Sequence, residues 1–158
     1  MLKFVKLQLG QGWVADSNSP EPQVSVEASS VNVRFRSYRV VDDKKPTGIL
    51  RALGLFSKSS SKFEETWSTL RFAGCSRWRW DSTNDHEWYK VDGHGRHSGA
   101  APRWGEFYEL IGPDPDPDHD ALSWEKIGAD TTTSRHFLYY FRDETLEFMA
   151  EDWSFFPS

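Results

Sequence analysis

The chain has 158 residues, a formal net charge of −5, 15% aromatic residues with 8 Trp among them, and one cysteine. This length predicts a single domain over residues 1–158, the aromatic content argues against disorder throughout, and one cysteine excludes an intramolecular disulfide framework. The N-terminal MLKFVKLQLGQGW has no continuous apolar run, and no stretch of about 18 apolar residues occurs. We therefore expect no signal peptide, no membrane span and a cytoplasmic protein.

The charge is unevenly distributed along the chain. Residues 1–79 contain 13 Lys and Arg against 7 Asp and Glu, whereas residues 80–158 contain 6 against 17. Two interpretations are open: the halves of one domain neutralise each other, or the fold presents separate basic and acidic surfaces that steer a charged partner. We favour the first, because sequence halves rarely map onto separate faces of a β-rich domain.

Strand patterns dominate the first part of the chain. Alternation of apolar and polar residues predicts strands at Lys3–Leu9, from Val24 onward, and from Val31 to about Val41. The segment Asp16–Pro22 consists of turn residues. Apolar residues at helical spacing predict a short helix over Thr47–Gly54, and Ser57–Ser61 is a flexible connection.

The next segment permits two interpretations. Its start matches a helix capping box, and apolar residues at helical spacing leave a helix over 62–70 as the alternative. The later alternation RWRW over Arg77–Trp80 favours strands. We expect a turn near 61–66, followed by two strands across Trp67–Asp81 with a break at Gly74.

The patterns between Asp81 and Ser134 are short. We expect turns or loops at Asp81–Asp85, Gly93–Pro102 and Asp114–Asp120, and short elements at Glu87–Val91 and Trp124–Ile127. Trp104–Ile111 fits a helix or a strand, and its short length and aromatic content favour the strand.

The best-defined pattern is a β-hairpin near the C-terminal end. Two apolar runs, His136–Phe141 and Leu146–Ala150, flank the polar connection Arg142–Thr145, which has a common hairpin loop length. The first run is apolar or aromatic at both parities, so we expect Arg135–Phe141 to be an inner strand covered on both faces. Its antiparallel partner is expected to be Leu146–Phe156.

The second arm alternates more clearly than the first. Leu146, Phe148 and Ala150 are expected to face inward, with Glu147 and Glu151 outward. Beyond them the parity changes, because Trp153 and Phe155 share the parity of the glutamates. A bulge or bend near Ala150–Asp152 is therefore expected. The fold class predicted from all these elements is mainly β, an antiparallel sandwich or partly open barrel with one or two short helices and a closing C-terminal hairpin.

Two segments carry potential metal ligands. Asp114, Asp116, Asp118, Asp120 and Glu125 fall at the ligand positions of a calcium-binding EF-hand loop, but the position that requires Gly holds His119. His86, His94 and His97 lie within one glycine-rich stretch, but their spacing matches no metal-site signature. We interpret both segments as solvated loops, with no metal and no cofactor.

No nucleophile motif or phosphate-binding loop occurs in the chain. Cys75 follows Gly74 in a strand-like run, so we expect a buried structural thiol. If Trp78 and Trp80 share one strand face, Arg77 and Arg79 share the other. Exposed Trp beside Arg suits the binding of a protein, base or sugar, whereas buried Trp would belong to the core. We favour the core interpretation for most Trp. The candidate binding residues are Trp78, Trp80, Asp85, His86, Glu87, Trp88, Arg103, Trp104 and Glu106.

Three functional hypotheses follow. The first is a non-enzymatic interaction module, with the size and composition of an immunity-type or antitoxin-type protein, that binds a basic protein through an acidic, Trp-containing surface. The second is an aromatic-lined ligand-binding or hydrolytic barrel that uses Glu87, Glu106 or the histidines. The third is nucleic-acid binding through the cations of the first half, which a sequence pI near 5.5 opposes; these cations are Arg34, Arg36, Arg39, Lys44 and Lys45.

Overall fold

All regular secondary structure in the described part of the chain is β. The computed structural model describes residues 2–16, 21–41, 62–81, 103, 105–113, 124–141 and 144–158. The strands are β1 (Lys3–Leu7), β2 (Trp13–Ala15), β3 (Gln23–Glu27), β4 (Ser30–Val41), β5 (Lys62–Ala73), β6 (Arg77–Asp81), β7 (Glu106–Ile111), β8 (Glu125–Lys126), β9 (Arg135–Tyr140), β10 (Thr145–Ala150) and β11 (Asp152–Pro157).

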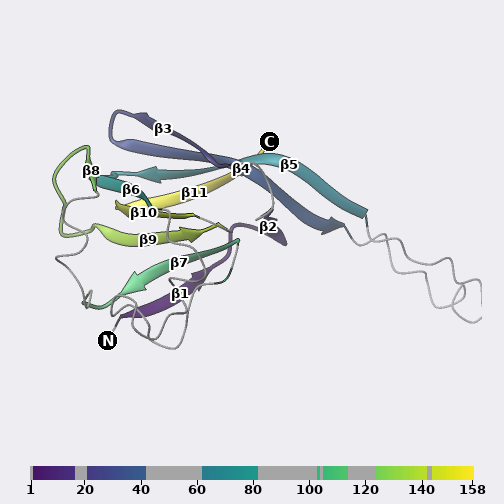
Figure 1. Cartoon of the computed structure of the whole chain (residues 1–158), viewed down its shortest axis with the longest axis horizontal. Helices are drawn as coiled ribbons and strands as arrows, with labels where there is room; N and C mark the ends of the chain where they lie inside the picture. Colours follow the sequence, from purple (N-terminus) through teal and green to yellow (C-terminus); the bar gives the residue numbers. More distant parts are fainter. Residues whose placement is uncertain are drawn as a thin grey trace, which may run out of the picture.

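The strands form two antiparallel sheets (Figure 1). Sheet A has six strands in the order β1-β7-β9-β10-β6-β8. Sheet B has five strands, in the order β11-β5-β4-β2 with β3 also paired to β4. The prediction of an antiparallel, mainly β architecture is confirmed.

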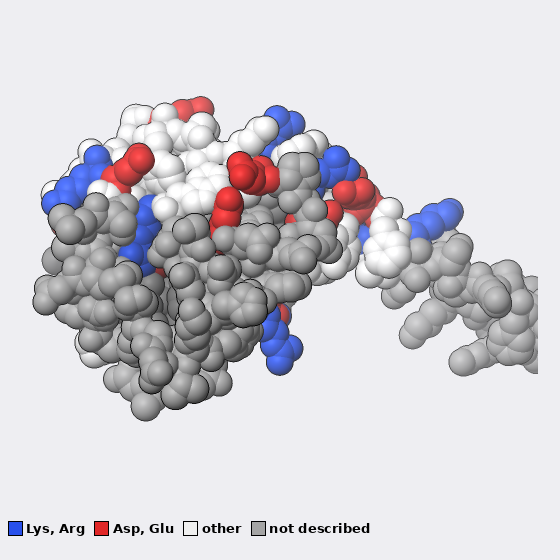
Figure 2. All heavy atoms as spheres, in the orientation of Figure 1, with Lys and Arg blue, Asp and Glu red and all other residues white. Residues whose placement is uncertain are grey.

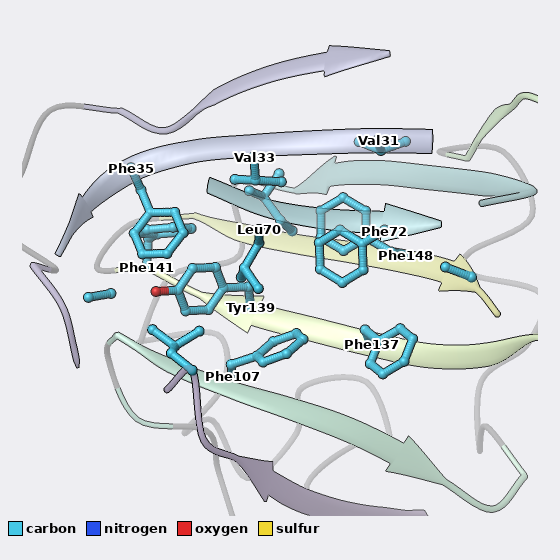
Figure 3. Packing of buried hydrophobic residues seen from close by; sticks show 14 of the residues in the cluster. Val31, Val33, Phe35, Leu70, Phe72, Phe107, Phe137, Tyr139, Phe141 and Phe148 are labelled. Atoms are coloured by element: carbon cyan, nitrogen blue, oxygen red, sulfur yellow. The ribbon is translucent and has the colours of Figure 1, made fainter. Parts of the chain in front are cut away.

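Aromatic side chains fill the space between the two sheets (Figure 3). Phe72 of β5 stacks on Phe148 of β10 with ring centroids 3.9 Å apart. Phe35 of β4 meets the edge of Tyr139 of β9 at 5.2 Å. These residues are buried, and each of the phenylalanines contributes roughly 1.5–3 kcal/mol by leaving water. The interlocking rings define the core of the sandwich.

Strand β9 is an inner strand buried on both faces, as the sequence predicts. It lies between β7 and β10, and its residues Phe137, Leu138 and Tyr139 are fully buried, as is Phe148 of β10. Leu138 belongs to a second apolar cluster on the face of sheet A turned away from sheet B. We call this face the outer face of sheet A.

The closing hairpin is present, but its second arm is divided between the sheets. Residues Thr145–Ala150 pair with β9, whereas Asp152–Pro157 pair with β5 in sheet B. The expected pairing of the first arm with residues up to Phe156 is therefore wrong beyond Ala150. The expected bend is found at Glu151, where the chain passes from sheet A to sheet B. Because of this bend, residues of even number before it and of odd number after it face the same core.

Glycine allows the chain to change sheets a second time beside this bend. Between β5 and β6, Gly74 has φ +59°, and a Cβ built there would lie 2.7 Å from Cγ of Glu151. The left-handed backbone favours glycine, and the side chain of Glu151 would have to move to admit a Cβ at this position. The predicted break at Gly74 is thus confirmed, and it forms a corner of the sandwich.

The start of β5 differs from the prediction. Residues 62–66 are strand, so the expected turn near 61–66 and the alternative helix over 62–70 are both wrong. Pairing with β4 overrides the local helical pattern: Arg39 donates to Glu64 at 2.7 Å, and Tyr38 packs edge-on against Phe63. As a result β4 and β5 form a long ribbon that projects from the sandwich (Figure 1).

The N-terminal prediction is nearly right. The first strand ends at Leu7 rather than Leu9, and the short strand β2 at Trp13–Ala15 has no counterpart among the predicted elements. Strand β7 confirms the strand interpretation of Trp104–Ile111 from Glu106 onward.

Several predicted segments lie outside the described residues. These are the helix over Thr47–Gly54, the connection Ser57–Ser61, the element Glu87–Val91, the loop Gly93–Pro102, the calcium-like aspartates of Asp114–Asp120 and the histidines His86, His94 and His97.

Candidate functional site

A buried charged cluster lies on the outer face of sheet A. Arg79 of β6 and Glu147 of β10 stand opposite each other in the strand register, form an ion pair, and are each only 1% exposed. The second oxygen of Glu147 lies 2.6 Å from Nε2 of His136 on β9. We call Arg79, Glu147 and His136 the buried charge cluster.

Trp124 closes one side of this cluster. The guanidinium groups of Arg77 and Arg79 each lie 4.9 Å from its ring centroid, and its ring meets that of His136 at 5.8 Å. Arg77 also forms an ion pair with Asp130 at 3.2 Å. Cation–π stacking of this kind is stronger where water is excluded, so Trp124 and Glu147 together hold the arginines in place.

The pair of Glu147 and His136 resembles the acid and the base of a catalytic triad. A carboxylate that binds one imidazole nitrogen fixes the ring and leaves the other nitrogen for proton transfer. Here the same carboxylate is shared with Arg79, and among the described residues no hydroxyl or thiol hydrogen-bonds His136. Buried ion pairs with a purely structural role have the same appearance, and the described geometry contains no nucleophile that would favour catalysis.

A second polar group occupies the far side of the same face. Glu106 of β7 binds Lys6 and the hydroxyl of Tyr108, and that hydroxyl accepts a hydrogen bond of 3.1 Å from the backbone N–H of Arg103. Burial raises the pKa of Glu106, but the hydrogen bonds from Lys6 and Tyr108 and the charges of Lys6 and Arg103 outweigh it, so the pKa lies below its ordinary value. Glu106 is therefore held as a carboxylate and is unsuited to donate a proton.

The four candidate binding residues that the structure describes lie at two places in the fold. Trp78 and Trp80 lie on the face of β6 turned toward sheet B, opposite in register to Phe148 and Leu146. Glu106 is on β7, three strand positions away, a distance of roughly 14 Å. Arg103 lies near Glu106, and Asp85, His86, Glu87, Trp88 and Trp104 lie outside the described residues.

The two described tryptophans of this set differ in burial. Trp78 is half-buried and packs against the core, whereas Trp80 is 37% exposed. Arg77 and Arg79 are on the opposite strand face, as the alternation predicts, and they stack on Trp124 rather than on their sequence neighbours.

Three ion pairs in the described part of the fold join the basic first half of the sequence to its acidic second half. Lys6–Glu106, Arg77–Asp130 and Arg79–Glu147 each join a cation of the first half to an acid of the second. Figure 2 shows acidic and basic residues interspersed over the described part of the visible face. This arrangement favours the interpretation that the halves neutralise each other.

Cys75 is not a candidate nucleophile. The residue is buried, and burial raises the pKa of its thiol to about 12 despite a hydrogen bond to the carbonyl of Arg77. A thiol that stays protonated is a poor nucleophile.

Sheet B exposes a different surface on the side away from the core. Its centre is Trp67 of β5, with the guanidinium groups of Arg34 and Arg36 at 4.9 Å and 5.6 Å from the ring centroid. Phe156 of β11 faces Thr69 in the register, which places it diagonally across from Trp67, about 7–8 Å away. Phe156 is 52% exposed.

The same face continues along the projecting ribbon. Tyr38 pairs with Val14 in the register and contacts Phe63, and Phe63 pairs with Val40. Phe63 is 64% exposed, the highest fraction among the large apolar residues described. We call this surface the outer stripe; it consists of Val14, Tyr38, Val40, Phe63, Trp67 and Phe156.

Comparison with protein-family models, with curated proteins and with solved structures finds no match. Within the described ranges, no three His, Cys, Asp or Glu residues group so as to hold a metal ion. Those ranges also contain no helix whose length and apolarity would let it cross a membrane.

The sequence interpretation missed both surfaces described here. Glu147 was expected to face solvent, and the outer stripe draws on strands that are far apart in sequence. The one signal was the alternation of Arg34 and Arg36 with buried Phe35, which indicates that β4 has a polar outer face.

Proposed function

We propose that this protein is a non-enzymatic protein-binding module and that its partner docks on the outer stripe of sheet B. The observation that carries the proposal is the set of exposed aromatic and aliphatic side chains that one sheet face presents between Phe63 and Phe156, with the Arg36–Glu65 ion pair among them. Contiguous apolar surface rimmed by charged residues is typical of interaction sites.

The composition of the stripe supports a protein partner. Trp, Tyr and Arg are the residues that most often dominate binding free energy in protein interfaces. Trp67 and Tyr38 are half-buried, and the arginine stacking on Trp67 fixes its ring before binding, which reduces the entropy lost on association.

The charges around the stripe indicate the chemistry of the partner. Arg34 and Arg71 are exposed, and neither forms an ion pair with another described residue. A partner segment that carries Asp or Glu beside an apolar side chain would complement them.

The nucleic-acid hypothesis receives less support from this region. Arg36 is paired with Glu65 and Arg39 with Glu64, each at 2.7 Å, so their charges are neutralised before any phosphate approaches. Arg39 is also on the opposite strand face, over Trp13. Lys44 and Lys45 lie outside the described residues.

The experiment has two stages. The protein is first used as bait in a bacterial lysate, and the captured protein is purified for titration with wild type and variants. We expect Phe156→Ala to weaken binding at least tenfold, as truncation of an interface anchor does, and Arg34→Glu to weaken it further for an acidic partner. Val26→Ala is the matched control, because Val26 is 46% exposed on β3 and outside the stripe. Equal affinity of Phe156→Ala and wild type would contradict the proposal.

A second candidate surface surrounds Trp80, the more exposed of the two described tryptophans on β6. In this version the acidic second half binds a basic partner around that ring, and the protein acts as an immunity-type or antitoxin-type protein in the cytoplasm. Raising salt from about 50 to 500 mM would shorten the screening length from about 14 to 4 Å and slow association. Loss of affinity in Trp80→Ala with none in Phe156→Ala would favour this surface over the outer stripe.

A further inference from the structure

Strand β5 has an open edge where the ribbon projects from the sandwich. Strand β4 pairs with β5 from Lys62 to Phe72. On the other side, β11 pairs only with Ser68–Ala73, and the N–H of Ser158 adds one bond to the carbonyl of Trp67. No described strand pairs with this side of Lys62–Thr66.

The direction of the backbone groups on this edge follows from Trp67. In an antiparallel strand the N–H and C=O of one residue point to the same side, and successive residues alternate. The carbonyl of Trp67 points away from β4, toward Ser158. Glu65 and Phe63 have the same parity, so their N–H and C=O groups point to the open edge and are positioned to pair with an added strand.

We propose that a second copy of this chain adds its own β5 to this edge. The two strands run antiparallel about a two-fold axis at Phe63. Phe63 then lies opposite Phe63 of the partner subunit, and Lys62 lies opposite the partner's Glu64. The two ribbons join into one continuous sheet.

The charges on β5 select this register. Moving the axis by one residue toward the C-terminal end of β5 places Glu64 opposite the partner's Glu64, and moving it by two residues places Glu65 opposite the partner's Glu65. A shift in the other direction places Lys62 opposite the partner's Lys62. Like charges directly opposite each other destabilise a sheet, whereas opposite charges and aromatic pairs stabilise it. The axis at Phe63 is the one that avoids all like-charge pairs among these residues.

The surroundings of Phe63 favour this pairing. Its side chain is the most exposed large apolar group described, and it lies on the ribbon that projects from the sandwich (Figure 1). The charges on the strand also exclude indiscriminate pairing with other edges, as edge strands require. Because the paired segment is short, its area falls below that of a stable interface, and we expect a dimer with a micromolar dissociation constant.

The charge register is tested by sedimentation velocity over a range of concentrations. Wild type is expected to show a monomer–dimer equilibrium. Lys62→Glu places like charges opposite each other twice and is expected to weaken the dimer at least tenfold. The double variant Lys62→Glu/Glu64→Lys restores opposite charges in the same register and is expected to return the dissociation constant to within a few-fold of wild type. Monomer up to about 1 mM, or failure of the double variant to recover while its thermal unfolding is unchanged, would overturn the proposal.

Disulfide trapping tests the axis position. Residues facing each other in a hydrogen-bonded antiparallel pair have Cα atoms about 5.5 Å apart, within the range that a disulfide spans. Phe63→Cys is therefore expected to cross-link to itself under mild oxidation. Glu65→Cys is the matched control, since this register does not place it opposite its own copy. Equal cross-linking of the two variants would show that the strands do not pair as proposed.

Discussion

The outer faces of the two sheets carry similar residues in opposite environments. On sheet A, Arg79 and Glu147 form an ion pair that is almost completely buried. On sheet B, Arg36 and Glu65 form an ion pair at 2.7 Å with both side chains in contact with solvent. Each arginine also lies over a tryptophan, Trp124 in the first case and Trp67 in the second.

This difference shows that burial, rather than residue type, determines what such a group contributes. In the buried pair each charge has lost most of its hydration, so removal of one partner takes away part of what compensates the charge of the other. In the exposed pair water replaces a missing partner at little cost. The first arrangement is suited to fix the fold, whereas the second contributes little to its stability.

The largest effect is expected from breaking the buried pair. Arg79→Met leaves the carboxylate of Glu147 buried with its main cation removed, and should lower the free energy of unfolding by about 3–5 kcal/mol. Urea denaturation of wild type and variant measures this difference.

The double variant Arg79→Met/Glu147→Leu is the control for this prediction. It removes both charges together, so most of the lost stability should return. A single variant as stable as wild type would show that solvent reaches Glu147, and the contrast between the two faces would fail.

The next largest loss of stability is expected in the apolar part of the outer face of sheet A. Leu138 lies opposite Glu147 in the register and is fully buried. Leu138→Ala should cost about 2–5 kcal/mol, the usual range for a buried leucine. An unchanged thermal unfolding temperature would mean that the outer face of sheet A is less well packed than its burial implies.

The sequence predicts the fold best where a strand has apolar side chains at both its odd and its even positions, and therefore on both faces. His136–Phe141 carries that pattern, and β9 is the inner strand that it predicts. The prediction for the start of β5 was wrong because the local residue pattern there is that of a capped helix. The strand forms by pairing with Tyr38, Arg39 and other β4 residues that are distant in sequence. Long-range pairing of this kind leaves no signal within the segment itself.

The candidate site was harder to predict for a related reason. The parity of Glu147 was right, since it points away from Leu146 and Phe148, but its burial was missed. The pattern of β9 could have indicated this burial. Leu138 lies on the same face of sheet A as Glu147, so chain that covers Leu138 also covers the glutamate. The outer stripe, in contrast, depends on register between β2, β4, β5 and β11, which one sequence does not determine.

A smaller effect is expected at the partly exposed pair of Arg135 and Glu109. The hydrogen bonds and charge of Arg135 hold the pKa of Glu109 below its ordinary 4.5, although burial opposes this. A carboxylate with a lowered pKa in the folded state adds stability above its unfolded pKa, and that stability is lost as the pH falls through the folded pKa. Between about pH 7 and pH 3, wild type should therefore lose more stability than Glu109→Gln. Parallel curves in urea denaturation would contradict this assignment.

The smallest effect is expected at the exposed pair, and it gives the sharpest test of the contrast between the faces. Glu65→Gln and Glu147→Gln make the same chemical change, from a carboxylate to an amide of nearly equal shape. In Glu65→Gln the charge of Arg36 remains hydrated and stacked on Trp67, so the free energy of unfolding should change by less than about 1 kcal/mol. In Glu147→Gln the buried guanidinium of Arg79 loses the carboxylate charge that pairs with it, so the loss should be several-fold larger. Thermal and urea denaturation of both variants at low and high salt separates the two cases, because salt should alter only the exposed pair. Equal losses would mean that the two faces are equally hydrated, and the outer face of sheet A would then be as open to a ligand as that of sheet B.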